Sequence, residues 1–116
     1  MASALKTAFA EARRTGSMIP VFEPFVQAQL YVVGVVNPAG TLKILLKSSP
    51  TPGNLCATVS EERGWLKDVP QDRCLPITGR RLVELLGDGK DVVVVYADGG
   101  DLLQHEYVEI FRDALD

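Results

Sequence analysis

The sequence predicts an α/β fold, in which a mixed sheet of about five strands is covered by helices on one or both faces. Strand-like and helix-like segments alternate between residues 55 and 96, which is typical of the α/β class. A strand pair precedes them, because two apolar runs flank the turn sequence Asn37-Pro38-Ala39-Gly40. The 116 residues are enough for one domain with its own core, residues 1–116.

Two helices are expected before the first strand. Apolar residues recur at helical spacing in residues 2–15, and Gly16 ends this helix. Prolines at helix-starting positions predict a second, shorter helix over residues 21–28. A continuous β-branched and aromatic run over residues 30–36 predicts a strand buried on both faces, and residues 41–47 return beside it as a hairpin.

The second half of the chain predicts three further strands, over residues 55–59, 74–77 and 91–96. Two crossover helices are expected between them, over residues 60–67 and 78–86. The first of these helices begins with Ser-Glu-Glu, a sequence that suits a helix N-terminus.

A terminal helix is expected after the turn sequence Asp98-Gly99-Gly100-Asp101. Asp101 is the predicted cap of this helix. Its apolar side comprises Leu102, Leu103, Tyr107, Ile110, Phe111 and Leu115.

Charge is unevenly distributed along the chain, although the net charge is only −3. Residues 1–50 carry five basic and two acidic side chains, whereas residues 51–116 carry seven and thirteen. Nucleic-acid binding requires a concentration of basic residues, so no nucleic-acid partner is expected. An acidic C-terminal part attracts basic proteins instead.

The two cysteines, Cys56 and Cys74, are isolated, and the chain has one histidine. A structural zinc site needs about four ligands, so no metal or other cofactor is expected. Both cysteines lie in apolar strand segments and are predicted to be buried free thiols in a reducing compartment. The sequence shows no secretory leader and no apolar run long enough to span a membrane, which predicts a cytoplasmic protein.

Three sequence stretches carry a family resemblance: VSEERGWL from Val59, ITGRRLVELL from Ile77 and DVVVVYADGG from Asp91. With the order of elements around them, they resemble the N-terminal domain of the SseB family, the group named for enhanced serine sensitivity. The resemblance covers most of the chain, from about Ala4 to Asp113. It implies an α/β domain of poorly defined biochemistry and supplies no catalytic residues.

The candidate ligand site is the start of the second crossover helix: Thr78, Gly79, Arg80 and Arg81. Basic residues at a helix N-terminus oppose the helix dipole, and a bound phosphate or carboxylate removes that conflict. The alternative is that both arginines point to solvent or pair with Glu84.

Other candidate groups have structural interpretations. His105 could serve Ser60 or Cys56 in a catalytic set, but the GxSxG sequence around a nucleophilic serine is absent, and a solvated or capping role suits it. Trp65 is either a core residue or a surface anchor for a partner. A loose acidic cluster lacks the EF-hand pattern of a calcium site, and a turn explains its residues. The cluster comprises Asp98, Asp101 and Glu106.

The sequence as a whole predicts a small non-catalytic bacterial protein that acts by binding another protein, as an accessory, adaptor or regulatory module. The predicted partner surface is the acidic terminal segment with Asp101, Glu106, Glu109 and Asp113. One alternative is a regulator that binds a small ligand or anion, and the resemblance to the SseB family implies a connection with amino-acid metabolism. Another is a toxin-neutralising protein of the immunity type. Both a monomer and a homodimer remain open.

Overall fold

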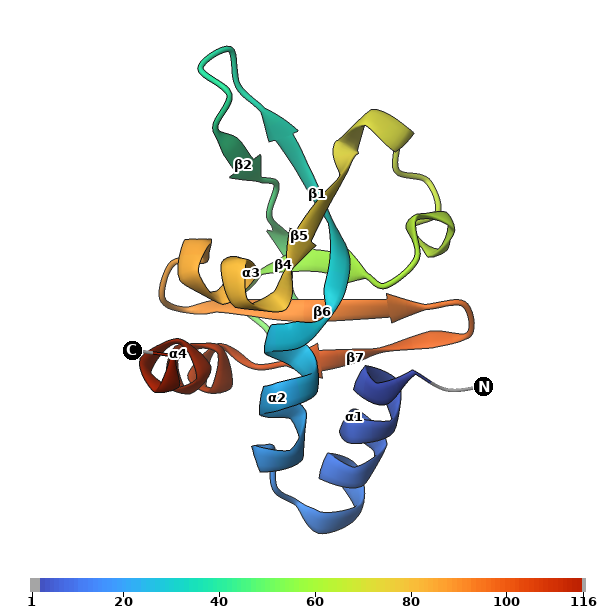
Figure 1. The fold of residues 1–116 in the computed structure, drawn as a ribbon, viewed down its shortest axis with the longest axis vertical. Helices are drawn as coiled ribbons and strands as arrows, with labels where there is room; N and C mark the ends of the chain where they lie inside the picture. The colour runs from blue at the N-terminus through green and yellow to red at the C-terminus, as the bar shows by residue number, and fades with distance from the viewer. Residues whose placement is uncertain (1–2, 116) are drawn as a thin grey trace.

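Residues 3–115, which the computed structural model describes, form four α-helices and seven strands (Figure 1). Two short 3-10 turns, Arg63–Trp65 and Gln71–Arg73, separate β4 from β5. In chain order the elements are α1 Ala4–Thr15, α2 Ile19–Gln27, β1 Gln29–Val36, β2 Leu42–Ile44, β3 Lys47–Ser48, β4 Leu55–Ser60, β5 Cys74–Thr78, α3 Gly79–Leu85, β6 Lys90–Tyr96, β7 Gly99–Leu103 and α4 His105–Ala114.

The strands form one mixed sheet, which confirms the predicted α/β class. The main order is β2-β1-β4-β6-β7, with β5 paired to β1 and β3 paired to β4. The neighbours β4 and β6 run parallel, and the other described pairs are antiparallel. The number of strands exceeds the predicted five because the return strand of the first hairpin divides into β2 and β3, and because β7 was not expected.

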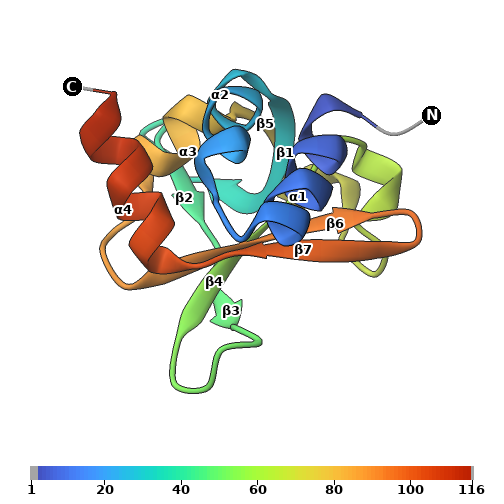
Figure 2. The same cartoon turned by 90° about the horizontal axis from the view of Figure 1, so that it is seen from below.

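The four helices lie on one side of the β6–β7 ribbon, whereas β3 and the loop after it extend from the other side (Figure 2). The core therefore lies between the helices and the inward face of the sheet. Its largest fully buried side chains come from all four helices or from β1, β4, β6 and β7: Leu5, Val21, Phe25, Leu30, Val32, Val59, Leu82, Val83, Val92, Val94, Leu103 and Val108.

The two N-terminal helices begin and end close to the predicted positions. The Ser3 side chain accepts the Lys6 N–H at 3.1 Å, and Gly16 ends α1 in the left-handed conformation with φ of 76°. None of the helices within residues 3–115 is long and apolar enough to cross a membrane.

The predicted helix over residues 60–67 is wrong. Ser60 stays in β4, where it pairs with Tyr31 of β1, and only Arg63–Trp65 form a single 3-10 turn. The Ser60 hydroxyl accepts the Glu62 N–H at 3.1 Å and donates to the Glu62 carbonyl at 2.8 Å. This local bonding competes with helix formation, so the residue expected to start a helix instead makes a tight turn.

The predicted turn over residues 98–101 lies instead at Ala97 and Asp98, and the prediction of Asp101 as a helix cap is wrong. Gly99–Leu103 form β7, which pairs antiparallel with β6 and places Asp101 opposite Val94. The register leaves only Ala97 and Asp98 as the connection, so the hairpin is tight. α4 starts later, at His105, and has no side-chain cap from Gln104.

β1 is not buried on both faces, although its composition predicted that. Leu30, Val32 and Gly34 are buried, and the residues between them are partly exposed. Only the face with Leu30 and Val32 packs into the core, and a run of apolar residues does not show which face that is.

Candidate functional site

The predicted anion site at the start of α3 is largely occupied by its own backbone bonds. The Thr78 hydroxyl accepts the Arg81 N–H at 3.1 Å, and the Gly79 N–H donates to the Ala28 carbonyl at 3.0 Å. The exposed Arg80 and Arg81 side chains lie 3.9 and 4.0 Å from carboxylate oxygens of Glu84. The four residues are therefore neighbours, but two of the groups that an anion would need are already engaged.

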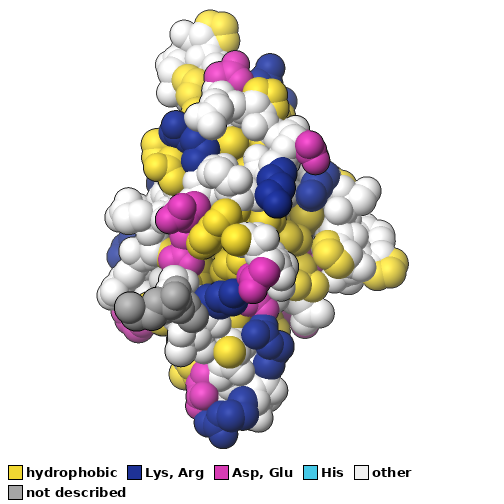
Figure 3. Space-filling model, turned by 90° about the vertical axis from the view of Figure 1, so that its right-hand side faces the viewer, with side chains coloured by type: hydrophobic (Ala, Val, Ile, Leu, Met, Phe, Trp, Pro, Cys, Tyr) yellow, Lys and Arg dark blue, Asp and Glu magenta, His cyan; other side chains and the backbone are white. Residues whose placement is uncertain are grey.

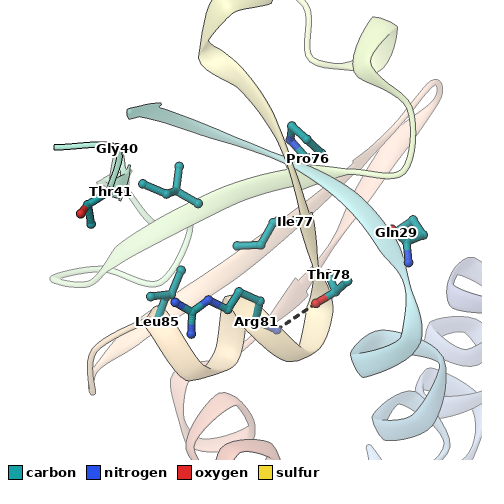
Figure 4. A pocket seen from close by; sticks show the side chains of 9 residues that line it. Gln29, Gly40, Thr41, Pro76, Ile77, Thr78, Arg81 and Leu85 are labelled. Atoms are coloured by element: carbon teal, nitrogen blue, oxygen red, sulfur yellow. Dashed lines mark hydrogen bonds between the residues drawn. The ribbon is translucent and has the colours of Figure 1, made fainter. Parts of the chain in front are cut away.

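Arg81 and Thr78 also line an open pocket of about 650 Å³ between α3 and the β1–β2 hairpin (Figure 4). Figure 4 shows Arg81 and Leu85 on α3 on one side of this pocket, and Thr41 of the hairpin on the other. Ile77 of β5 lies between them. The pocket thus combines an apolar wall with an exposed guanidinium.

A second, smaller pocket of about 260 Å³ continues the first along β2. The two pockets share Leu42 and Leu85, and the second adds Ile44, Leu46 and two basic side chains, Lys43 and Lys90. We call the two pockets together the β2–α3 groove. Its charged lining residues are Arg81, Lys43 and Lys90, so the groove is basic.

Two of the four predicted partner-binding residues have structural roles. The Asp101 side chain is only 7% exposed, accepts the Tyr96 hydroxyl at 2.7 Å and pairs with Arg13 of α1. Burial, together with this hydrogen bond to a carboxylate, raises the pKa of Tyr96. Glu109 accepts the Gly89 N–H at 3.0 Å, which holds the start of β6 against α4.

The other two, Glu106 and Asp113, are exposed on α4. They stand four residues before and three residues after Ile110, so helical spacing places them beside it on the same side of α4. Ile110 is itself 57% exposed. Two acidic side chains therefore flank an exposed apolar one.

Ile110 borders an apolar groove of about 530 Å³ between α2 and α4, which we call the α2–α4 groove. Phe22 and Phe111 form its floor, with ring centroids 5.2 Å apart in an edge-to-face arrangement. Ile19, at the start of α2, is 83% exposed on the opposite rim. Among its lining residues in the described range 3–115, only Glu23 is charged, so this groove is apolar with an acidic rim.

The residues considered for catalysis are not brought together as a reactive set. His105 pairs with carboxylates of its own helix, at 3.1 Å to Glu109 and 3.3 Å to Glu106. The hydrogen bond to Glu109 is the main cause that raises the pKa of His105. Ser60 is buried and bonded to Glu62, and burial raises the pKa of the Cys56 thiol, which disfavours the reactive thiolate.

Trp65 packs against the core and is partly buried. Its ring meets that of Tyr96 edge to face, with centroids 6.4 Å apart.

Figure 3 shows the side of the molecule where the β6–β7 turn and the 61–73 connector lie, and apolar side chains there are surrounded by both basic and acidic ones. This side therefore lacks a single charge sign that would select a partner.

Cys56 and Cys74 are both buried, as predicted, and neither is bonded to the other. Within residues 3–115, no group of three or more potential ligands of the His, Cys, Asp and Glu types is placed to hold a metal ion.

Sequence reasoning missed the carboxylate of Asp91, a fully buried residue at the start of β6. It accepts hydrogen bonds from the Ser49 hydroxyl at 2.5 Å, from the His105 N–H at 2.8 Å and from the Asn54 amide at 3.4 Å. Burial alone would raise the pKa of Asp91, but these hydrogen bonds outweigh it and hold the pKa below its ordinary value. The signal in the sequence was an acidic residue directly before a run of valines.

Comparison with protein-family models, with curated proteins and with solved structures found no match for this chain. The resemblance to the SseB family therefore stays a prediction from the sequence.

Proposed function

We propose that this chain is a non-catalytic, SseB-like accessory or regulatory module of the bacterial cytoplasm that binds another protein. The observation that carries the proposal is the α2–α4 groove. An aromatic floor, two exposed isoleucines and an acidic rim combine the features of a protein-docking surface, in which apolar anchors are buried and charges set the orientation.

The chemistry of the groove indicates the partner. Grooves between helices take amphipathic helices, which bury their apolar side chains. The acidic residues Glu23, Glu106 and Asp113 favour basic residues beside those apolar ones. A basic target is also what the toxin-neutralising alternative requires, so the same surface serves both forms of the proposal.

A small-ligand regulator receives less support from the geometry. At its predicted site, the Thr78 hydroxyl already accepts the Arg81 N–H, and the Gly79 N–H already donates to the Ala28 carbonyl. Gly79 is held by packing, because a Cβ at this position would lie 1.7 Å from the Phe25 carbonyl oxygen. Both features explain these residues without a ligand.

The variant Ile110→Lys tests the groove. We expect it to weaken the binding of a synthetic amphipathic helix of leucine and lysine, about 18 residues long, at least tenfold. The substitution removes an apolar anchor, and the new ammonium group repels the lysines of the peptide. Isotherms from isothermal titration calorimetry give the affinity. The same peptide with glutamate in place of lysine is expected to bind more weakly to the wild type.

The matched control is Val36→Lys, because Val36 is also 57% exposed and lies on β1, away from the α2–α4 groove. This variant makes the same change in net charge. Equal affinity of both variants for the leucine–lysine helix would show that only net charge matters and would contradict a specific groove. In affinity capture, the relevant partner is a protein retained by the wild type and by Val36→Lys but lost with Ile110→Lys.

A further inference from the structure

We infer that the free edge of β2 is a second binding surface, which takes an extended acidic segment of a partner protein as an added strand. This surface is separate from the α2–α4 groove. The inference combines three observations: the unpaired edge of β2, the β2–α3 groove beside it and the basic side chains of that groove.

The register of the hairpin shows which backbone groups of β2 are free. The Asn37 N–H donates to Thr41 and the Leu45 N–H donates to Val33, so in the alternating ladder Val35 and Lys43 form the hydrogen-bonded pair between them. The backbone groups of Leu42 and Ile44 therefore point away from β1. Within residues 3–115, β2 ends the sheet order and no strand covers this edge.

An edge strand with free N–H and C=O groups is a template for strand addition. The edge of β5 is less suited, because Pro76 interrupts its row of donors. The partly exposed side chains of Leu42 and Ile44 and the exposed Leu46 and Leu85 line the β2–α3 groove beside β2. Alternate side chains of an added strand would bury these apolar groups.

Charge decides the chemistry of the added strand. The charged lining residues of the groove are Lys43, Lys90 and Arg81. Acidic residues in the added segment complement them, whereas a second copy of this chain added antiparallel about Lys43 would place two lysines opposite each other. The occupant that fits is therefore a partner segment in which apolar and acidic residues alternate.

The probe is a peptide of alternating valine and glutamate, about eight residues long and blocked at both ends. We expect it to slow hydrogen exchange of the Leu42 and Ile44 amides at least tenfold, as measured by NMR, because strand addition gives both amides an acceptor. A matched control peptide with lysine in place of each glutamate is expected to have no such effect. Unchanged exchange of both amides at saturating valine–glutamate peptide would overturn the proposal.

Ile44→Pro removes one free N–H and is expected to weaken the peptide affinity at least tenfold, with Val36→Pro as the control. The register puts the Val36 N–H on the other edge of the hairpin, so this control keeps the free edge of β2. Lys43→Glu keeps the backbone intact and is also expected to weaken binding, which tests the proposal if the proline variant does not fold.

Two other occupants give distinct results, and each overturns the inference. If inorganic phosphate alone shifts the resonances of Arg81 and competes with the peptide, the groove binds a small anion. If the chain forms a concentration-dependent dimer that protects the Leu42 and Ile44 amides from hydrogen exchange without peptide, and Ile44→Pro abolishes this dimer, the edge binds a second copy of the chain.

Discussion

Replacing Gly79 by alanine is expected to lower the free energy of unfolding by about 3 kcal/mol or more, or to prevent folding. A Cβ at this position would lie 1.7 Å from the carbonyl oxygen of Phe25 and 3.2 Å from the Cα of Val26. Both contacts are with the backbone of α2, so no side-chain rotation relieves them. The end of α2 and the start of α3 would have to separate, and both elements contribute fully buried side chains to the core.

Urea unfolding followed by circular dichroism measures this effect. Gly87→Ala is the matched control, because a Cβ at Gly87 meets nothing within 4 Å and its φ is not in the left-handed region. The control is expected to change the free energy of unfolding by less than about 1 kcal/mol. Equal stability of the two variants would show that α2 and α3 do not approach each other as closely as described.

The same pair of variants separates packing from ligand binding at the predicted anion site. If Gly79 served mainly to let an anion approach the backbone of α3, Gly79→Ala would fold normally and lose only anion binding. A loss of stability without any ligand is what the α2–α3 contact requires.

Patterns formed by residues close in sequence predicted most of the fold. Helical spacing of apolar residues located α1, and runs of β-branched residues located β1, β4 and β6 within one or two residues. These patterns are local, because they depend on residues within one element, although in β1 the apolar run does not show which face is buried. A serine such as Ser60 is ambiguous, since the same hydroxyl suits a helix cap and a tight turn, and the pairing of β4 with β1 decided between them.

The candidate surfaces were harder to predict, because exposure depends on partners distant in sequence. Asp101 and Asp113 look alike as acidic residues near the C-terminus. Arg13, 88 residues away, pairs with Asp101 and leaves its side chain 7% exposed, whereas Asp113 is exposed. The α2–α4 groove also needs two helices about 80 residues apart, and no pattern within either helix shows that they meet.

Asp91→Ala is expected to lower the free energy of unfolding by about 3 kcal/mol at neutral pH, because each hydrogen bond to a buried carboxylate contributes about 1.5–3 kcal/mol and the contributions overlap. The carboxylate joins the start of β6 to the 49–54 loop and to the first N–H of α4, so it acts as a remote cap for that helix. The exposed Asp113 provides the control, and Asp113→Ala is expected to change the stability by no more than about 0.5 kcal/mol.

The contribution of Asp91 is expected to depend on pH in one direction only. Its pKa is lower in the folded protein than the ordinary 3.8, so the folded state binds the proton less tightly than the unfolded state does. The stabilisation is therefore complete above about pH 5 and is lost as the pH falls through the folded pKa. The difference in unfolding free energy between the wild type and Asp91→Asn should shrink between pH 5 and about pH 2. Because the other carboxylates titrate in both proteins, a difference that stays constant over this range would show that Asp91 acts by shape and not by its charge.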